Sequence, residues 1–139
     1  MKETLTKLLA VVLVGTLLAV SSSSAQEDRV GRAWALVGTW EGIVDDPVPA
    51  ADTNRTLVIV WVWPKDGKLV ANGRYGITGK GSGQVDIEVE DTGDGIMIRF
   101  MTGANSRARL SLVGIEHLTG ALKPAGPLPD LRMNLWKRK

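Results

Sequence analysis

The segment VDIEVEDTGDGIMIRFM, residues 85–101, decides the fold of this chain. Apolar and polar residues alternate in its first part, and a period of two is typical of a strand with one buried face. The middle is rich in Asp and Gly, which favour turns, and the last part is apolar at every other position. The segment therefore predicts an antiparallel hairpin. The residues expected on its inner face are Val85, Ile87, Val89, Ile96, Ile98 and Phe100.

The same alternation recurs along the chain in short runs separated by Gly, Pro, Asp and Asn. The predicted strands cover residues 36–44, 56–63, 68–78, 84–90, 96–102, 107–113, 117–123 and 130–138. Most connections are short, which favours a meander, and closure removes the exposed edges of the sheet. The sequence therefore predicts an all-β fold, an up-and-down antiparallel meander of about eight strands closed into a small barrel. Residues 36–139 form this single domain.

The strand registers follow from placing apolar residues on one face, because a slip of one residue inverts every side chain. With a turn at 64–68, large residues lie opposite small ones, as a dense interior requires. The expected pairs are Trp63 with Leu69, Trp61 with Ala71, Ile59 with Gly73 and Leu57 with Tyr75. In the hairpin of residues 85–101, the expected outer pair is Asp86 with Arg99.

The first residues have the layout of a secretory signal peptide. Lys2 and Lys7 lie before an apolar block at residues 8–20, and Ser23-Ser24-Ala25 supplies small residues for cleavage. The block is shorter than the roughly 20 residues that span a bilayer. We expect cleavage after Ala25 and a secreted or periplasmic protein with no stable membrane span after cleavage; a retained membrane anchor is the alternative. Residues 26–35 then form a short helical lead-in, with Asp28 as its N-cap.

Composition excludes several classes of site. The chain has no Cys and a single His, so neither disulfides nor a typical zinc site is expected, and no metal or cofactor is predicted. The basic tail at 137–139 lacks the aromatic platforms of a nucleic-acid interface, so no nucleic-acid partner is expected. His117, in a predicted turn, has no serine placed beside it, and the acids of 86–94 fit an exposed strand face and a turn. We therefore predict no catalytic residues and no enzymatic activity.

The segment LVGTWEG, residues 36–42, resembles the Gly-x-Trp opening of lipocalins and their calycin relatives. The resemblance implies that Trp40 closes one end of the barrel and packs under a basic residue of the last strand. Lys137 fits by alternation with Leu135, and Arg138 is the other candidate. The chain departs from the family in lacking the second lipocalin motif, Thr-Asp-x-x-x-Tyr, and in being short, so the resemblance implies a fold more than a ligand.

Two functions are compatible with these features. In the first, the barrel is non-enzymatic and binds a small apolar or amphipathic ligand, because ligand sites are mostly apolar and aromatic. The expected lining residues are Trp61, Trp63, Tyr75 and Phe100.

In the second, the interior is fully packed and the chain is a structural or protein-interaction module of the cell envelope. Residues 56–63 are apolar on both faces, which leaves valines on the outside of the barrel. The expected outer residues are Val58, Val60, Val62 and Val70. Either the N-terminal turn with Trp34 covers them, or another chain does, through homo-oligomerisation or an envelope protein.

Overall fold

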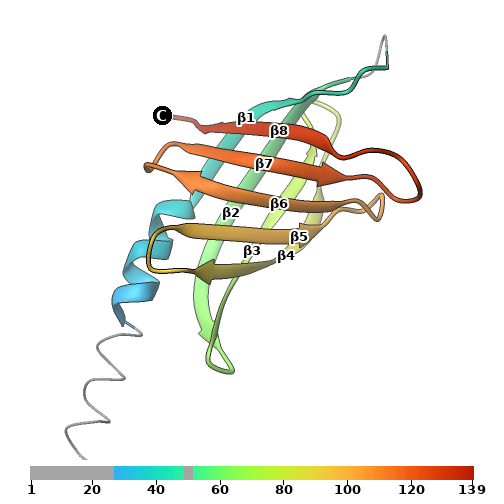
Figure 1. The fold of residues 1–139 in the computed structure, drawn as a ribbon. Coiled ribbons are helices and arrows are strands. Elements are labelled where there is room, and N and C mark those ends of the chain that lie inside the picture. Colours follow the sequence, from blue (N-terminus) through green and yellow to red (C-terminus); the bar gives the residue numbers. More distant parts are fainter. Residues whose placement is uncertain (1–26, 49–51) are drawn as a thin grey trace, which may run out of the picture.

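The computed structural model describes residues 27–48 and 52–139, and over these ranges the chain forms a closed antiparallel barrel (Figure 1). Each strand pairs with the next, and β1 pairs with β8 to close the sheet. The strands are β1 (Gly38–Val44), β2 (Asn54–Lys65), β3 (Lys68–Ile77), β4 (Gly83–Asp91), β5 (Ile96–Met101), β6 (Arg107–Val113), β7 (His117–Lys123) and β8 (Leu131–Lys137). The predicted fold class is confirmed. The predicted signal peptide and its cleavage site lie outside the described residues.

The N-terminal lead-in is longer than the single turn that the sequence predicts. Residues 27–33 are α-helical and continue into the 3-10 helix η1 (Trp34–Leu36). Ala33 and Leu36 are fully buried. Figure 1 shows this helical segment at the same end of the barrel as the C-terminus. We call this the helix end, and the opposite end, where the β1–β2, β3–β4, β5–β6 and β7–β8 connections lie, the loop end.

The barrel interior is filled with side chains from the lead-in and the strands. The largest fully buried residues are Trp40, Leu36, Leu57, Ile59, Ile87, Ile98, Leu110, Leu118, Met133, Leu135, Val44 and Val62. An eight-stranded barrel is just wide enough for its own side chains to fill. These residues therefore form one continuous core.

A β-bulge in β2 corrects the predicted register. Leu57 pairs with Tyr75 and Ile59 with Gly73, as expected, but the register then shifts between Ile59 and Trp61. A bulge adds one residue to one strand, so every later side chain changes face.

The predicted pairs of the two tryptophans beyond the bulge are therefore wrong. Trp61 pairs with Asn72 and Trp63 with Val70, and both side chains lie on the outside of the barrel. Val62 takes the inner position and is buried, so its predicted outer position is also wrong. Trp40 already occupies the helix end of this narrow interior, and a small Val fits there at less cost than two more indoles.

The β4–β5 hairpin departs from the predicted register by two residues rather than one. Arg99 lies opposite Glu88, not Asp86, and its guanidinium Nη2 is 3.1 Å from Glu90 Oε2. The hairpin loop is correspondingly shorter, because β4 continues to Asp91. A slip of two leaves every residue on its predicted face, so Val85, Ile87, Val89, Ile96, Ile98 and Phe100 are all buried as expected.

Candidate functional site

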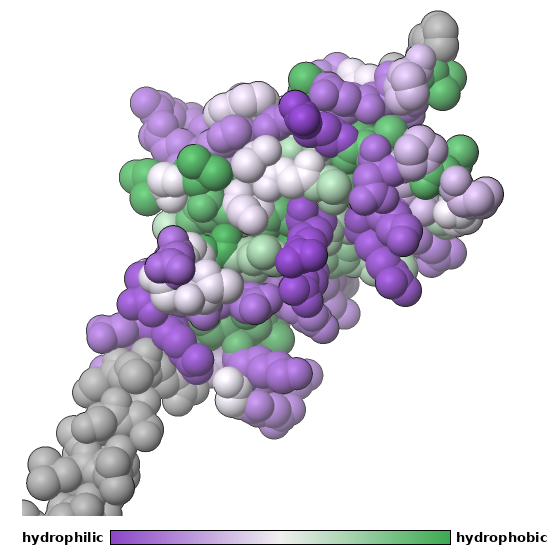
Figure 2. Space-filling view, viewed as in Figure 1, coloured by the Kyte–Doolittle hydropathy of each residue, from purple (hydrophilic) through white to green (hydrophobic). Residues whose placement is uncertain are grey.

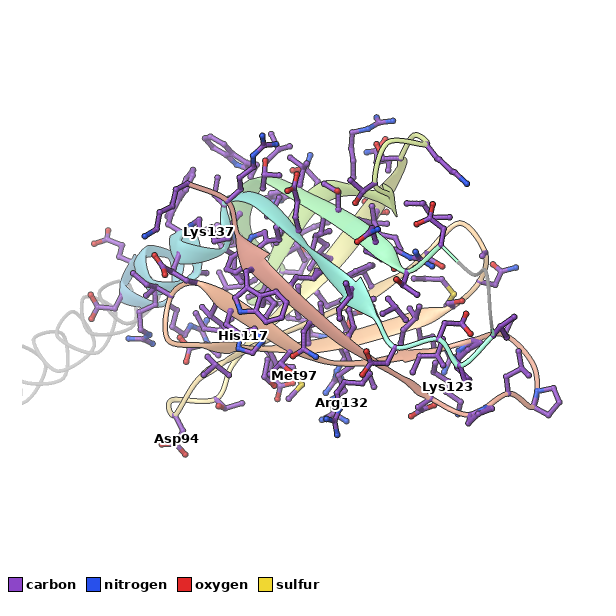
Figure 3. All side chains as sticks on the ribbon, turned by 90° about the horizontal axis from the view of Figure 1, so that it is seen from above. Asp94, Met97, His117, Lys123, Arg132 and Lys137 are labelled. Atoms are coloured by element: carbon purple, nitrogen blue, oxygen red, sulfur yellow. The ribbon has the colours of Figure 1, made fainter. Side chains whose placement is uncertain are left out.

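The helix end is closed by Trp40 under Lys137. Trp40 is completely buried, and its Nε1 donates a hydrogen bond of 2.8 Å to the carbonyl oxygen of Leu36. The Lys137 ammonium lies 5.5 Å from the centroid of the Trp40 ring and donates to the carbonyl oxygen of Ala35 at 2.7 Å (Figure 3). The structure therefore brings together the two residues that the sequence assigns to barrel closure. Arg138, the other basic candidate, instead donates to Glu41 at 3.2 Å.

A second contact holds the lead-in on the barrel. Asp91, the last residue of β4, has a side chain only 4% exposed, and its Oδ2 accepts from Nε and Nη2 of Arg32 at 2.8 and 2.7 Å. Its Oδ1 accepts from the Gly93 amide at 2.9 Å. Burial alone would raise the pKa of Asp91, but the Gly93 amide and the Arg32 guanidinium outweigh it and hold the pKa below its ordinary value.

This contact predicts a pH dependence of lead-in docking. A depressed carboxyl pKa contributes stability that is complete above the unfolded-state pKa, roughly 4, and is lost as pH falls through the lower folded-state pKa. Acidification below about pH 4 should therefore lower the amide protection factors of residues 27–36, which correct exchange for its intrinsic pH dependence, before those of the barrel strands fall. In Asp91→Asn, these protection factors should already be low at neutral pH and should not fall further in acid. Equal acid dependence in both proteins would contradict the contact.

At the loop end, two of the predicted ligand residues meet. The Tyr75 and Phe100 rings face the interior with their centroids 5.3 Å apart, and both side chains are buried. The Tyr75 hydroxyl is inaccessible to solvent and has no hydrogen-bond partner among the described residues. Burial raises the pKa of Tyr75, and the neighbouring Arg55 guanidinium partly opposes this. Arg55 Nη1 itself donates to the backbone oxygens of Asp52 and Asn54 at 2.6 and 3.1 Å.

The other two predicted ligand residues form part of an outer surface. Trp61 is 53% exposed, Val60 at the bulge is 56% exposed, and Trp34 of η1 is 40% exposed. The Trp34 and Trp61 rings meet edge to face, with centroids 5.2 Å apart. We call Trp34, Val60, Trp61 and Trp63 the tryptophan face.

The interaction surface that the sequence predicts from valines consists mainly of tryptophan side chains in the structure. Val58 and Val70 lie beside the tryptophan face and are partly buried, whereas Val62 has left it for the interior. The lead-in reaches this surface through Trp34, as one of the two sequence alternatives expects, yet more than half of Val60 and Trp61 stays exposed. Sequence alternation did not reveal this face, because nothing in the residue pattern marks the bulge.

His117 is not the solvated turn residue that the sequence predicts. It begins β7, is partly buried, and stacks on Trp136 with ring centroids 4.9 Å apart and an interplanar angle of 2°. Its Nε2 is 3.0 Å from Asn134 Oδ1, which also accepts from Thr119 Oγ1 at 2.8 Å. These contacts hold the His117 imidazole in a network of side chains on the outside of β7 and β8.

Comparison of the chain with family models, with curated proteins and with solved structures finds no match. The relationship to lipocalins therefore stays a prediction. Within residues 27–48 and 52–139, no three His, Asp or Glu side chains are grouped as metal ligands would be. No helix in the described part of the chain has the length and apolar character needed to span a bilayer.

Proposed function

We propose that this chain is an exported, non-enzymatic module that docks on a lipid surface of the cell envelope through its tryptophan face. The observation that carries the proposal is the bulge at Val60, which turns Trp61 and Trp63 away from the core. Bulges re-aim side chains and are maintained features of a fold. An exposed apolar surface of this kind marks an interaction site, because leaving it in water is costly.

The residues beside the tryptophan face favour lipid as the partner. Lys65 follows Trp63 on β2, lies opposite Lys68 on β3, and is exposed with it at the tip of the β2–β3 hairpin. Tryptophan prefers the membrane interface, and each lysine near an anionic surface contributes about 1 kcal/mol. Protein–protein interfaces are instead depleted in lysine. Asp66 and Glu88 line the same hollow as these lysines and formally balance their two charges, so the indoles carry most of the proposed affinity.

The test uses residues 26–139, because the fully buried side chains of the described structure lie between residues 33 and 135. This chain should co-sediment with vesicles of phosphatidylglycerol and phosphatidylcholine. In the double variant Trp61→Ser, Trp63→Ser, the partition coefficient should fall at least about tenfold, because each indole loses its apolar transfer to the interface. Trp136→Ser is the matched control, since Trp136 is 49% exposed and lies on β8.

Equal vesicle binding by the double variant and the Trp136 control would contradict the proposal. A second copy of the chain is the competing occupant of this face. If residues 26–139 were dimeric without vesicles, and Trp61→Ser made them monomeric without changing vesicle binding, the face would be a protein interface and the lipid proposal would be wrong.

A second function, binding of a small amphipathic ligand at the loop end, is favoured by the Tyr75 hydroxyl. A buried hydroxyl without a partner costs about 1–3 kcal/mol, and a ligand oxygen would satisfy it. Arg55, next to Tyr75, supplies a positive charge for a carboxylate. Tyr75 and Phe100 would contact the apolar part of such a ligand.

Tyr75→Phe tests this second function because it should have two opposite effects. The free energy of unfolding should rise by about 1 kcal/mol, since the unpaired hydroxyl is gone. Affinity for a medium-chain fatty acid, measured by displacement of a fluorescent naphthalene sulfonate, should fall about fivefold or more. Failure of the fatty acid to displace the dye from the unsubstituted chain would remove this function and leave lipid docking unaffected.

A further inference from the structure

The outer face of β5 to β8 carries a second cluster of charge, which shares Arg99 and Glu88 with the hollow that Lys65 and Lys68 line. Its exposed cations come from four neighbouring strands and are Arg99, Arg107, Arg109, Lys123 and Arg132. Figure 2, which views this side of the barrel, shows a strongly hydrophilic band across it. Lys123 and Arg132 are labelled along the same outer side in Figure 3.

The strand register places like charges against each other. Arg107 lies directly opposite Lys123, and Arg99 lies directly opposite Arg109. Arg132 lies opposite Ala121, which itself pairs with Arg109, so a single alanine separates these two arginines. Like charges directly opposite in a sheet are destabilising. The arrangement therefore costs stability unless an anion is bound.

Four of the five cations of this cluster have no ion-pair partner among the described residues. Arg99 is paired with Glu90. Among the described residues, no carboxylate oxygen lies within 4.0 Å of a side-chain nitrogen of Arg107, Arg109, Lys123 or Arg132. Within the described ranges Arg109 Nε donates to the Met97 sulfur alone, at 3.0 Å, and a thioether is a weak acceptor. The guanidinium and ammonium donors are thus available to a ligand.

A hollow of about 630 Å³ on the barrel wall is bordered by Arg99, Arg107, Arg109 and Lys123. Arg107, Arg109 and Lys123 line one side, and the small Ala121 leaves room between them. Asp86 and Glu88 of β4 line the opposite side, whereas Asp130, just before Leu131, comes next to Lys123 on the cationic side. This acidic rim would repel a long polyanion that crosses the face, whereas a compact anion can stay on the cationic side.

We infer that this hollow is a site for a compact, multiply charged oxyanion, such as a phosphate or pyrophosphate group. Arg107, Arg109 and Lys123 bind the anion, and Arg132 adds charge from β8. Guanidinium groups suit the oxygens of phosphate because their N–H donors form paired, charge-assisted hydrogen bonds. Binding also removes the like-charge repulsion across β6 and β7.

Titration of residues 26–139 with inorganic pyrophosphate tests the site. The backbone amide resonances of 107–109 and 121–123 should shift on addition of pyrophosphate at constant ionic strength, and the melting temperature should rise. In the double variant Arg107→Gln, Lys123→Gln, the affinity should fall about tenfold or more. Without pyrophosphate this variant should melt above the unsubstituted chain, because the repulsion is gone.

The matched control is Lys65→Gln, Lys68→Gln, which removes another pair of directly opposed exposed cations from β2 and β3. It should keep the full response to pyrophosphate. Absence of amide shifts in the unsubstituted chain, or an equal loss of response in both double variants, would overturn the site. Vesicle binding separates the source of the anion: if Arg107→Gln, Lys123→Gln also weakens binding to phosphatidylglycerol vesicles, the ligand is a lipid phosphate, and if vesicle binding is unchanged, it is a free one.

Discussion

Replacing Trp40 by alanine is expected to lower the free energy of unfolding by about 3–5 kcal/mol. The indole is completely buried at the helix end, donates to the Leu36 carbonyl, and lies under the Lys137 ammonium. Its loss leaves a cavity where the lead-in meets the barrel. Trp40→Phe should cost less, because most of the ring contact remains while the hydrogen bond is lost.

Urea denaturation of residues 26–139 measures these changes. Trp136→Ala is the control, because half of this side chain is in water, and its cost should be about 1 kcal/mol or less. Similar losses for Trp40→Ala and Trp136→Ala would show that Trp40 does not hold the helix end closed.

Gly42→Ala is expected to prevent proper closure of the sheet between β1 and β8. Gly42 lies opposite Leu135, and a Cβ there would run into the carbonyl oxygen of Asn134 and lie 2.8 Å from the Leu135 Cα. The neighbour is backbone and cannot rotate away, so we expect a loss of about 3 kcal/mol in the free energy of unfolding.

Gly31→Ala is the control for Gly42→Ala. Gly31 lies in the helical lead-in with nothing within 4 Å of an added Cβ, so alanine should be neutral or stabilise by up to about 1 kcal/mol. If thermal unfolding shows the same change for the two alanine variants, the close approach of β1 and β8 at Gly42 is not real.

Alternation predicted the barrel well because most strands obey it. Val85, Ile87 and Val89 on β4 face inward, as their period of two requires. The β2–β3 turn is formed by Asp66 and Gly67, both with positive φ, as a tight hairpin turn requires. The resemblance to lipocalins identified Trp40, and alternation with Leu135 identified Lys137, so the sequence could place Lys137 over Trp40. Strand order, in turn, followed from short connections.

The outer surfaces could not be predicted in the same way. A segment apolar on both faces, such as residues 56–63, fits either register, so the bulge at Val60 left no trace in the residue pattern. Trp61 and Trp63 were therefore placed inside, although the interior had no room for them. The cationic cluster was missed for another reason. Arg107 and Lys123 are 16 positions apart in the sequence, and only the β6–β7 register shows that they are neighbours.

The most direct test of lipid docking is fluorescence quenching by brominated lipid. Residues 26–139 should lose a large part of their tryptophan emission on vesicles whose phospholipids carry bromine near the interface, because Trp34, Trp61 and Trp63 enter the bilayer surface. The triple variant Trp34→Phe, Trp61→Phe, Trp63→Phe retains Trp40, which is buried, and Trp136 on β8; its emission should be unaffected. Quenching of the same size in the triple variant, or no quenching of the unsubstituted chain while it is bound to vesicles, would contradict the assignment of the tryptophan face as the docking surface.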